Sequence, residues 1–330
     1  MEAKRIKIEI LAGLTSAVVT MPVAIAYGYA CGLGPYAGFI SAIVLGLVAA
    51  LVGGTSGQIS SPTGALTVAI SVFVVTEKEI QGSLEGALPI LMVTFVLSGG
   101  LQFLFGLLKF GDNIQYIPFS VISGFMSGVG LIIIILQIPN TFGVVPVVHT
   151  SVISKILNIT YFFNNANWLA FVFVVATLTI IYIFPNITKK IPSSLVALLT
   201  LTGINHFFEL NIDVLGAFRV DLNQFSLISL DQLIDIDSVL RIMIAAVSLS
   251  FIGSVNTLLT SVVADKMTNT VHNSNQELMG QGMGNLFAGF LGGFTGSAAT
   301  ACTVANIPVS YTHLRAHETS LHLVCRLLLE

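Results

Sequence analysis

Long apolar runs separated by short polar loops dominate the chain from its first residues to about residue 292. A helix needs about 20 apolar residues to cross the hydrocarbon core of a bilayer, and eight of these runs approach or exceed that length. The pattern therefore predicts an all-α polytopic membrane protein, with spans near 8–28, 36–53, 84–108, 117–138, 168–185, 192–207, 239–263 and 278–292.

Two further apolar runs are long enough to cross only half a bilayer. One extends from Pro62 to Thr76 and the other begins at Ser297, and they follow the small-residue sequences GGTSGQISS and GGFTG. Within them, GALTV at 64–68 resembles TACTV at 300–304. Paired short segments in corresponding places predict a transporter built from inverted repeats, whose site lies where two half-helix N-termini meet. Alternatively, the small residues only allow helices to pack closely.

Composition agrees with lipid as the solvent for most of the chain. Hydrophobic residues make up 55% of the 330 residues, charged residues only 9%, and the mean hydropathy is +0.92, values that a soluble domain could not sustain. The net charge of −3 argues against a nucleic-acid partner. Cys31, Cys302 and Cys325 lie far apart, so we expect neither a disulfide framework nor a metal site.

Lysine and arginine residues set the expected orientation, because cytoplasmic loops carry an excess of both. A cytoplasmic N-terminus places seven of them inside, namely Lys4, Arg5, Lys7, Lys109, Lys189, Lys190 and Lys266. Only four then lie outside, namely Lys78, Lys155, Arg219 and Arg241. The acidic stretch 208–238 would face outward as a solvated loop.

Two long segments carry a family resemblance. The sequence resembles the SulP family of anion transporters in MPVAIAYGYACGLGPYAGFISAIVLGLVAALVGGTSGQISSPTGA and in LLTSVVADKMTNTVHNSNQELMGQGMGNLFAGFLGG. The segment FGDNIQYIPFSVISGFMSGVGLIIIILQ is similar to the family's middle region, and the resemblance extends from about residue 8 to 307. The eighth segment is most similar to the bacterial sodium-bicarbonate branch.

The resemblance implies a fold of fourteen segments in two inverted repeats of seven, like that of uracil permeases, usually followed by a cytoplasmic STAS domain. This chain would contain the first ten segments, including two half-helices. Family members move sulfate, bicarbonate, chloride, oxalate or C4-dicarboxylates, by exchange or by symport with sodium or protons.

The expected anion site follows from helix ends. A helix N-terminus carries unpaired N–H groups and about half a positive charge, so two N-termini aimed at one point bind an anion without a cationic side chain. We therefore expect the substrate to bind in a cavity at the two half-helix starts, which are formed by Thr63, Gly64, Ala65, Ala298, Ala299 and Thr300. The side chains of Gln58 and Tyr27 could reach the same cavity.

Two departures from the family pattern bear on coupling and substrate. Asn256 stands where many relatives carry Asp or Glu, and no predicted span has an acidic residue in its interior, which weakens a proton-coupled mechanism. Sodium remains a candidate coupling ion, bound weakly by oxygens of Asn256, Thr260 and Thr300, unless Asn256 only bridges helices. Cys302 stands where many relatives have Arg, and this neutral residue favours a monovalent anion such as bicarbonate or chloride over sulfate.

The end of the chain departs from the membrane pattern. A SulP chain should continue past Ile307, but the codons permitted for Val309 to Thr319 resemble the transposase mosaic-end adapter of sequencing libraries. Those permitted for Leu323 to Glu330 resemble the flow-cell adapter that follows it. We therefore expect 1–307 to be a partial SulP transmembrane domain and 308–330 to be adapter read-through that is not native. A natural amphipathic tail is the alternative.

Secondary transport of bicarbonate, chloride or sulfate is the leading functional hypothesis. The alternatives are C4-dicarboxylate transport, a nucleobase permease of the same fold, and an anion sensor that does not transport. Nucleobase permeases generally carry carboxylates in the eighth and tenth segments, where this chain has none. We expect no enzymatic activity and no cofactor besides sodium. The expected surroundings are the bacterial inner membrane, with a homodimer as a candidate assembly and a STAS domain missing from this chain.

Overall fold

The structure is a computed structural model that describes residues 2–116, 119–144, 152–187, 193–210, 236–304 and 306–307. Its contacts divide the chain into two units, Met1–Ile117 with Val220–Glu330, and Pro118–Arg219. Residues 308–330 and the centre of the acidic stretch 208–238 lie outside the described residues. The adapter interpretation and the solvated acidic loop therefore stay predictions.

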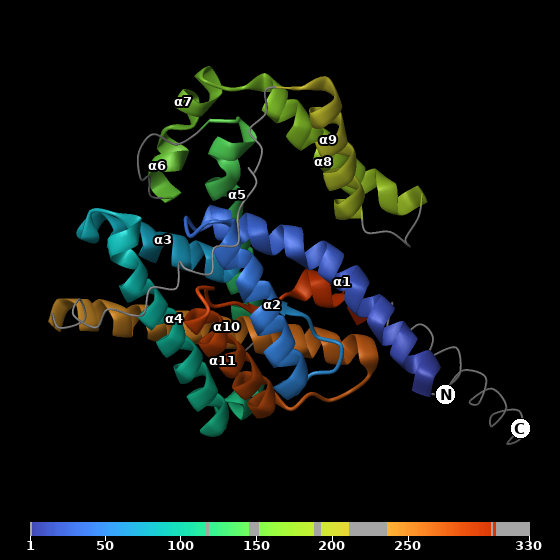
Figure 1. Cartoon of the computed structure of the whole chain (residues 1–330), viewed down its shortest axis with the longest axis vertical. Helices are drawn as coiled ribbons and strands as arrows, with labels where there is room; N and C mark the ends of the chain where they lie inside the picture. Colours follow the sequence, from blue (N-terminus) through green and yellow to red (C-terminus); the bar gives the residue numbers. More distant parts are fainter. Residues whose placement is uncertain are drawn as a thin grey trace, which may run out of the picture. The chain divides into compact units, whose positions relative to one another are not determined.

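Helices and two short strands make up the first unit (Figure 1). In chain order they are α1 (Glu2–Ala30), α2 (Pro35–Val52), β1 (Ser60–Ser61), α3 (Gly64–Gln81), α4 (Leu84–Leu107), the 3-10 helix η1 (Phe110–Tyr116), α10 (Ile236–Thr268), α11 (Ser274–Phe290) and β2 (Ser297–Ala298). A further helical segment at 300–304 follows β2.

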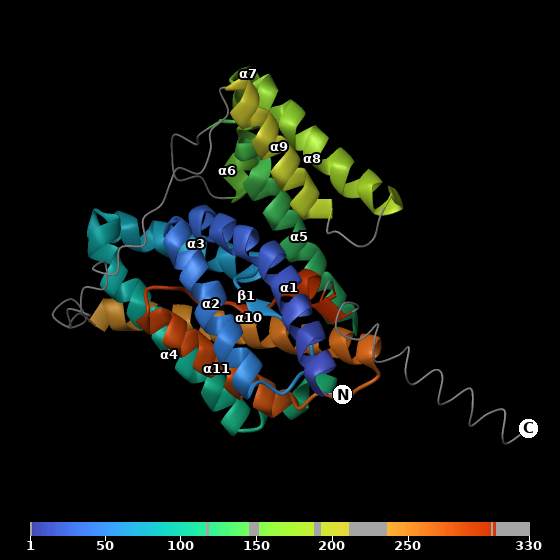
Figure 2. The ribbon, with the colours of Figure 1, turned by 45° about the vertical axis from the view of Figure 1, so that its right-hand side comes forward.

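Glycines let the helices of the first unit approach closely. A Cβ at Gly99 of α4 would overlap the backbone N of Leu286 and lie 2.8 Å from its Cα, and one at Gly282 of α11 would lie 2.6 Å from the Cα of Phe103. Both views show α2, α4 and α11 running side by side, while α3 and α10 lie across the picture (Figures 1 and 2). Lipid supplies no hydrophobic driving force between helices, so their association depends on close van der Waals packing, which small residues permit.

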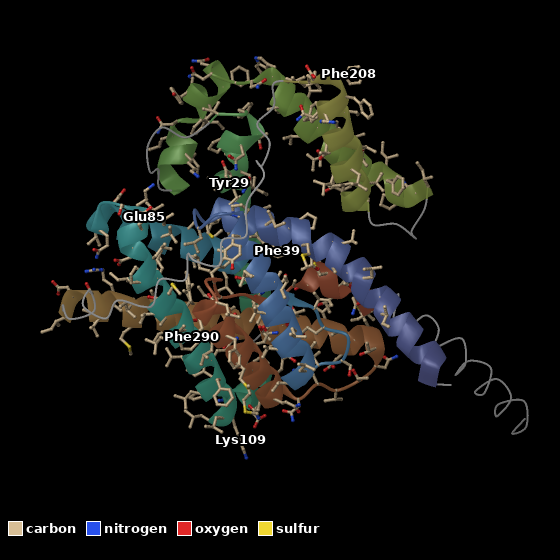
Figure 3. All side chains as sticks on the ribbon, in the orientation of Figure 1. Tyr29, Phe39, Glu85, Lys109, Phe208 and Phe290 are labelled. Atoms are coloured by element: carbon tan, nitrogen blue, oxygen red, sulfur yellow. The ribbon has the colours of Figure 1, made fainter. Side chains whose placement is uncertain are left out.

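The core of this unit lies around α3. Leu66 and Ile70 of α3 are fully buried with Phe95 of α4 and Phe294, and the two phenylalanine rings lie 6.5 Å apart, centroid to centroid. Because α3 packs on this core, its N-terminal end is held at a fixed place in the unit. The side chains of Glu85 and Lys109 mark the two ends of α4 in Figure 3.

The second unit contains α5 (Phe119–Thr141), α6 (Val152–Leu157), α7 (Ile159–Asn164), α8 (Trp168–Ile187) and α9 (Ser193–Phe208). Aromatic rings join the start of α8 to the segment before it. Phe142 stacks on Phe171 with ring centroids 5.7 Å apart, and Trp168 meets Phe163 edge-on at 5.2 Å. The two short helices α6 and α7 were not predicted from the apolar pattern.

Each of the eight predicted spans is a helix, and the prediction of a polytopic all-α chain is confirmed. Five helices among the described residues are long and apolar enough to cross a membrane. The first half-helix is longer than predicted, because α3 continues to Gln81 instead of ending at Thr76. Its polar end, TEKEIQ, continues the helix since none of these residues breaks it and Gly82 closes it with a φ of 74°.

Candidate functional site

A short antiparallel strand pair brings the two predicted half-helix starts together. β1 pairs with β2, with Ser60 opposite Ala298 and Ser61 opposite Ser297. Beyond the pair, the Thr63 and Ser297 hydroxyls lie 2.8 Å apart, and Thr63 is the N-cap of α3. Two segments more than 230 residues apart in sequence therefore meet immediately before their helices begin.

Backbone donors are left open at both starts. The first intrahelical bonds run from the Thr67 N–H to the Thr63 carbonyl, 2.9 Å, and from the Thr303 N–H to the Ala299 carbonyl, 2.9 Å. The N–H groups of residues 64–66 and 300–302 consequently have no partner within their own helices, as at any helix start. Such groups, together with the helix dipoles, favour a negative charge near this place.

One face of α10 supplies polar side chains to the junction. The Asn256 Nδ2 donates to the Ser297 hydroxyl at 2.7 Å and to the Ala298 carbonyl at 3.2 Å. The Thr260 hydroxyl lies 2.7 Å from that of Thr300, and the Thr257 hydroxyl accepts the Ala298 N–H at 3.3 Å. The spacing 256, 257, 260 places all three on one face of a helix.

The structure thus brings together most of the predicted site residues. Thr63, Ala298, Ala299 and Thr300 lie at the junction, and Gly64 and Ala65 form the first turn of α3. Asn256 and Thr260 join them as the coupling-ion hypothesis requires. Asn256 also bridges α10 to β2, so the helix-bridging role is observed, while a role in ion coupling stays a prediction.

Tyr27 and Gln58 lie in different surroundings. Tyr27 of α1 packs against the buried core of the unit. The Gln58 Nε2 donates to the Glu277 Oε1 at 2.6 Å, and its Oε1 accepts the Ser261 hydroxyl at 2.9 Å. Gln58 therefore lies on the side of β1 that faces α11.

A cavity of about 490 Å³ opens beside Gln58. Its wall consists of the loop 53–60, the α1 residues Ala12 and Gly13, Glu277 and Asn306. The Asn306 Nδ2 donates to the Gly57 carbonyl at 2.9 Å, which ties the loop to the end of the described chain.

Glu277 is a buried carboxylate that sequence reasoning missed. It is 2% exposed, its Oε2 accepts the Gly54 N–H at 2.8 Å, and its Oε1 also accepts the Gln281 Nε2 at 3.1 Å. Every one of these partners is a donor, which suits an ionised carboxylate.

Two carboxylates lie buried just beyond the predicted spans 62–76 and 278–292, namely Glu77 of α3 and Glu277 of α11. The expectation that no span interior carries an acidic residue stays a prediction, and so does the weakened case for proton coupling.

A sequence signal for Glu277 exists. Glu277, Gln281 and Asn285 are spaced by four and so form one polar stripe on an otherwise small and apolar helix. The Gln281 amide reaches the Ser60 hydroxyl, and Asn285 exchanges bonds with the backbone of Gly296 at 2.7 and 3.0 Å. The stripe therefore holds the segments on which β1 and β2 lie.

Comparison with known proteins gives one family match. The sequence profile described as the sulfate permease family matches residues 6–311. The bicarbonate transporter BicA of Picosynechococcus sp. is 38% identical over 309 residues, which cover 92% of this chain and 54% of that protein. The chain spans about half the length of the curated relatives it matches.

Two solved structures share the fold. One is the transmembrane domain of a cyanobacterial bicarbonate transporter BicA, with a TM-score of 0.80, 35% identity, and coverage of 92% of this chain and 77% of that one. The other is the overall structure of SLC26A9, with a TM-score of 0.77, 18% identity, and coverage of 92% and 50%. The fold is the inverted-repeat fold with seven segments in each repeat, as predicted.

Proposed function

Because the chain belongs to the sulfate permease family, we propose that it carries a small inorganic anion across a membrane by secondary active transport. The observation that carries this proposal is the junction of β1 and β2, which joins two helix starts whose N–H groups have no intrahelical partners. An anion placed there is stabilised by both helix dipoles.

The substrate we propose is bicarbonate. The side chains gathered at the junction are neutral, being hydroxyls and one amide, and Cys302 is buried in the first turn after it. Dipoles and hydroxyls compensate one negative charge better than two, so sulfate is less well matched than a monovalent anion. The relative BicA, 38% identical, is described as a bicarbonate transporter.

For coupling, we propose either sodium symport or anion exchange. Sodium takes oxygen ligands, as hard cations do, and the Thr260 hydroxyl lies within hydrogen-bond distance of both the Thr300 hydroxyl and the Ala298 carbonyl. Asn256 would join this set through its Oδ1, the amide atom that is not used in the bond to the Ala298 carbonyl.

The proposed setting is a bacterial inner membrane with the N-terminus in the cytoplasm. The excess of Lys and Arg on alternate loops supports this orientation. We further propose that the full-length protein is not an enzyme, that it forms homodimers, and that it carries a C-terminal STAS domain.

Transport in proteoliposomes tests the proposal. The full-length protein should take up labelled bicarbonate faster than protein-free vesicles, and faster than it takes up sulfate or succinate, with and without a sodium gradient. Faster succinate uptake would instead support C4-dicarboxylate transport, and uracil uptake a nucleobase permease. Anion binding without any flux would make the protein a sensor and contradict the proposal.

A further inference from the structure

The far end of α3 contains a partly buried ion pair, in which the Arg241 side chain is 28% exposed. The Glu77 side chain is fully buried, and the Arg241 Nε of α10 donates to its Oε1 at 2.8 Å. The Arg241 Nη2 also donates to the Ser238 hydroxyl at 3.0 Å, one turn earlier on α10. Among the described residues, Arg241 is the cation that pairs with Glu77.

The same two helices meet again at the candidate site. Thr63, the N-cap of α3, lies 2.8 Å from the Ser297 hydroxyl, which accepts the Asn256 Nδ2 of α10 at 2.7 Å. Since α3 leaves this place toward Glu77 and α10 arrives from Arg241, the two helices run antiparallel. Both views show them lying in the same direction across the picture (Figures 1 and 2).

The distance between the ion pair and the candidate site is nearly the same along α3 as along α10. At about 1.5 Å per residue, Glu77 lies about 20 Å from the first residue of α3, and Arg241 lies about 22 Å from Asn256. A helix is stiff along its axis, so a contact at one end fixes where the other end lies. If α3 slid along α10, the ion pair would break and Thr63 would move away from Ser297 at the same time.

We propose that Glu77 and Arg241 form a positioning pair, which sets the axial register of α3 against α10 and thereby places the first helix start opposite Asn256 and Ser297. The inference rests on the proposed transport function, because it assigns the pair a role in substrate affinity. Neither residue touches the substrate.

Control of the helix register explains why an ion pair stands between α3 and α10, which a contribution to stability alone does not. An ion pair with a buried carboxylate is a weak source of stability, since removing that charge from water offsets most of the attraction, and the best-attested use of buried ionic groups is to specify one register. The pair joins the far end of α3 to the helix that supplies Asn256 and Thr260, so the property it can set is the axial register of the two helices.

The test uses a variant that keeps the charge and changes the length. Glu77→Asp shortens the side chain by one methylene, so either the ion pair or the register must shift by about 1 Å, and misplacement of this size weakens binding by up to about 100-fold. We expect the KM for labelled bicarbonate, measured per mole of inserted full-length protein, to rise about tenfold. Glu79→Asp, an exposed carboxylate on the same helix, is the matched control and should leave the KM unchanged.

Arg241→Lys is the second variant, which keeps the charge and removes the forked contact with Ser238. It should raise the KM in the same direction. A purely structural pair would lower the amount of inserted protein and leave the KM of the remainder unchanged, and that result in either variant would overturn the inference. Absence of uptake by the unsubstituted protein would instead reject the proposed function.

Discussion

The Asn256 amide bridges two segments through its nitrogen and offers its oxygen for the proposed coupling role. Its nitrogen joins α10 to β2 through the Ser297 hydroxyl and the Ala298 carbonyl. A carbonyl can only accept, so this bond fixes which end of the amide is nitrogen. The oxygen is then the atom left for a cation, and a substitution that changes nitrogen to oxygen separates bridging from coupling.

Asn256→Asp in the full-length protein should strengthen sodium dependence. A formal charge 4 Å from sodium adds about 4 kcal/mol of attraction at an effective dielectric constant of 20, most of which desolvation offsets. Uptake without sodium should fall, because the bare carboxylate repels both the anion and the Ala298 carbonyl. Uptake with and without sodium is measured per mole of inserted protein. An unchanged ratio of the two would remove Asn256 from coupling.

Glu277 holds the loop before β1 through the hydrogen bonds that its side chain accepts from Gly54 and Gln58. Glu277→Gln leaves the same shape but weakens the bonds from Gly54 and Gln58, and hydrogen bonds to a charged group contribute about 1.5–3 kcal/mol each. We expect a loss of roughly 3 kcal/mol in the free energy of unfolding, seen as a lower Tm in detergent. Glu85→Gln, also an acidic residue in a first helical turn but exposed, should change the Tm little. Equal effects would contradict the role assigned to Glu277.

At the level of single helices, the apolar pattern predicts where a helix lies but not where it ends. All eight spans were found from their length, because a bilayer fixes the number of apolar residues that a helix must have. The end of α3 was missed, since a polar turn such as TEKEIQ can continue a helix when tertiary contacts such as Glu77 with Arg241 hold it. Helix ends follow partners that the local sequence does not contain.

Part of the candidate site was also predictable from the sequence. The small-residue segments at 64–68 and 300–304 indicated the two starts, and the family resemblance indicated Asn256. The polar stripe at 277, 281 and 285 is visible in the sequence, but the bonds of Glu277 and Gln281 to the β1 segment, like the pairing of β1 with β2, join residues more than 200 apart. A single sequence carries no signal for such pairs.

The crossing of α4 and α11 tests close packing between elements. Gly99→Ala should destabilise the protein by about 2 kcal/mol or more, because its methyl group would overlap the Leu286 backbone and force the helices apart. Gly100→Ala is the matched control, since nothing lies within 4 Å of its Cβ position; it should stabilise the helix by about 0.5–1 kcal/mol. Thermal unfolding in detergent measures both, and a Tm for Gly99→Ala at or above wild type would contradict the packing.

At the scale of the whole molecule, the chain spans about half the length of the curated relatives it matches. The helix α3 and the segment 300–304 both begin beside the β1–β2 pair, so the candidate site is shared between two distant parts of the chain. The adapter interpretation of residues 308–330 predicts that the gene encodes further apolar spans after Ile307. Amplified from source DNA without adapters, it should have a reading frame that continues past Ile307 with apolar spans. Recovery of the same residues 309–330 would contradict the adapter interpretation.

The central claim is that the two helix starts bind the transported anion. Thr300→Val removes one hydroxyl at the junction while keeping the side-chain shape, and a hydrogen bond to an ion contributes about 1.5–3 kcal/mol. The most direct measurement is the KM for labelled bicarbonate uptake by the full-length protein in proteoliposomes. We predict a rise of about tenfold or more in Thr300→Val and no change in Thr76→Val, whose exposed hydroxyl bonds only to its own helix. An unchanged KM in Thr300→Val at normal insertion would place the anion elsewhere and contradict the account.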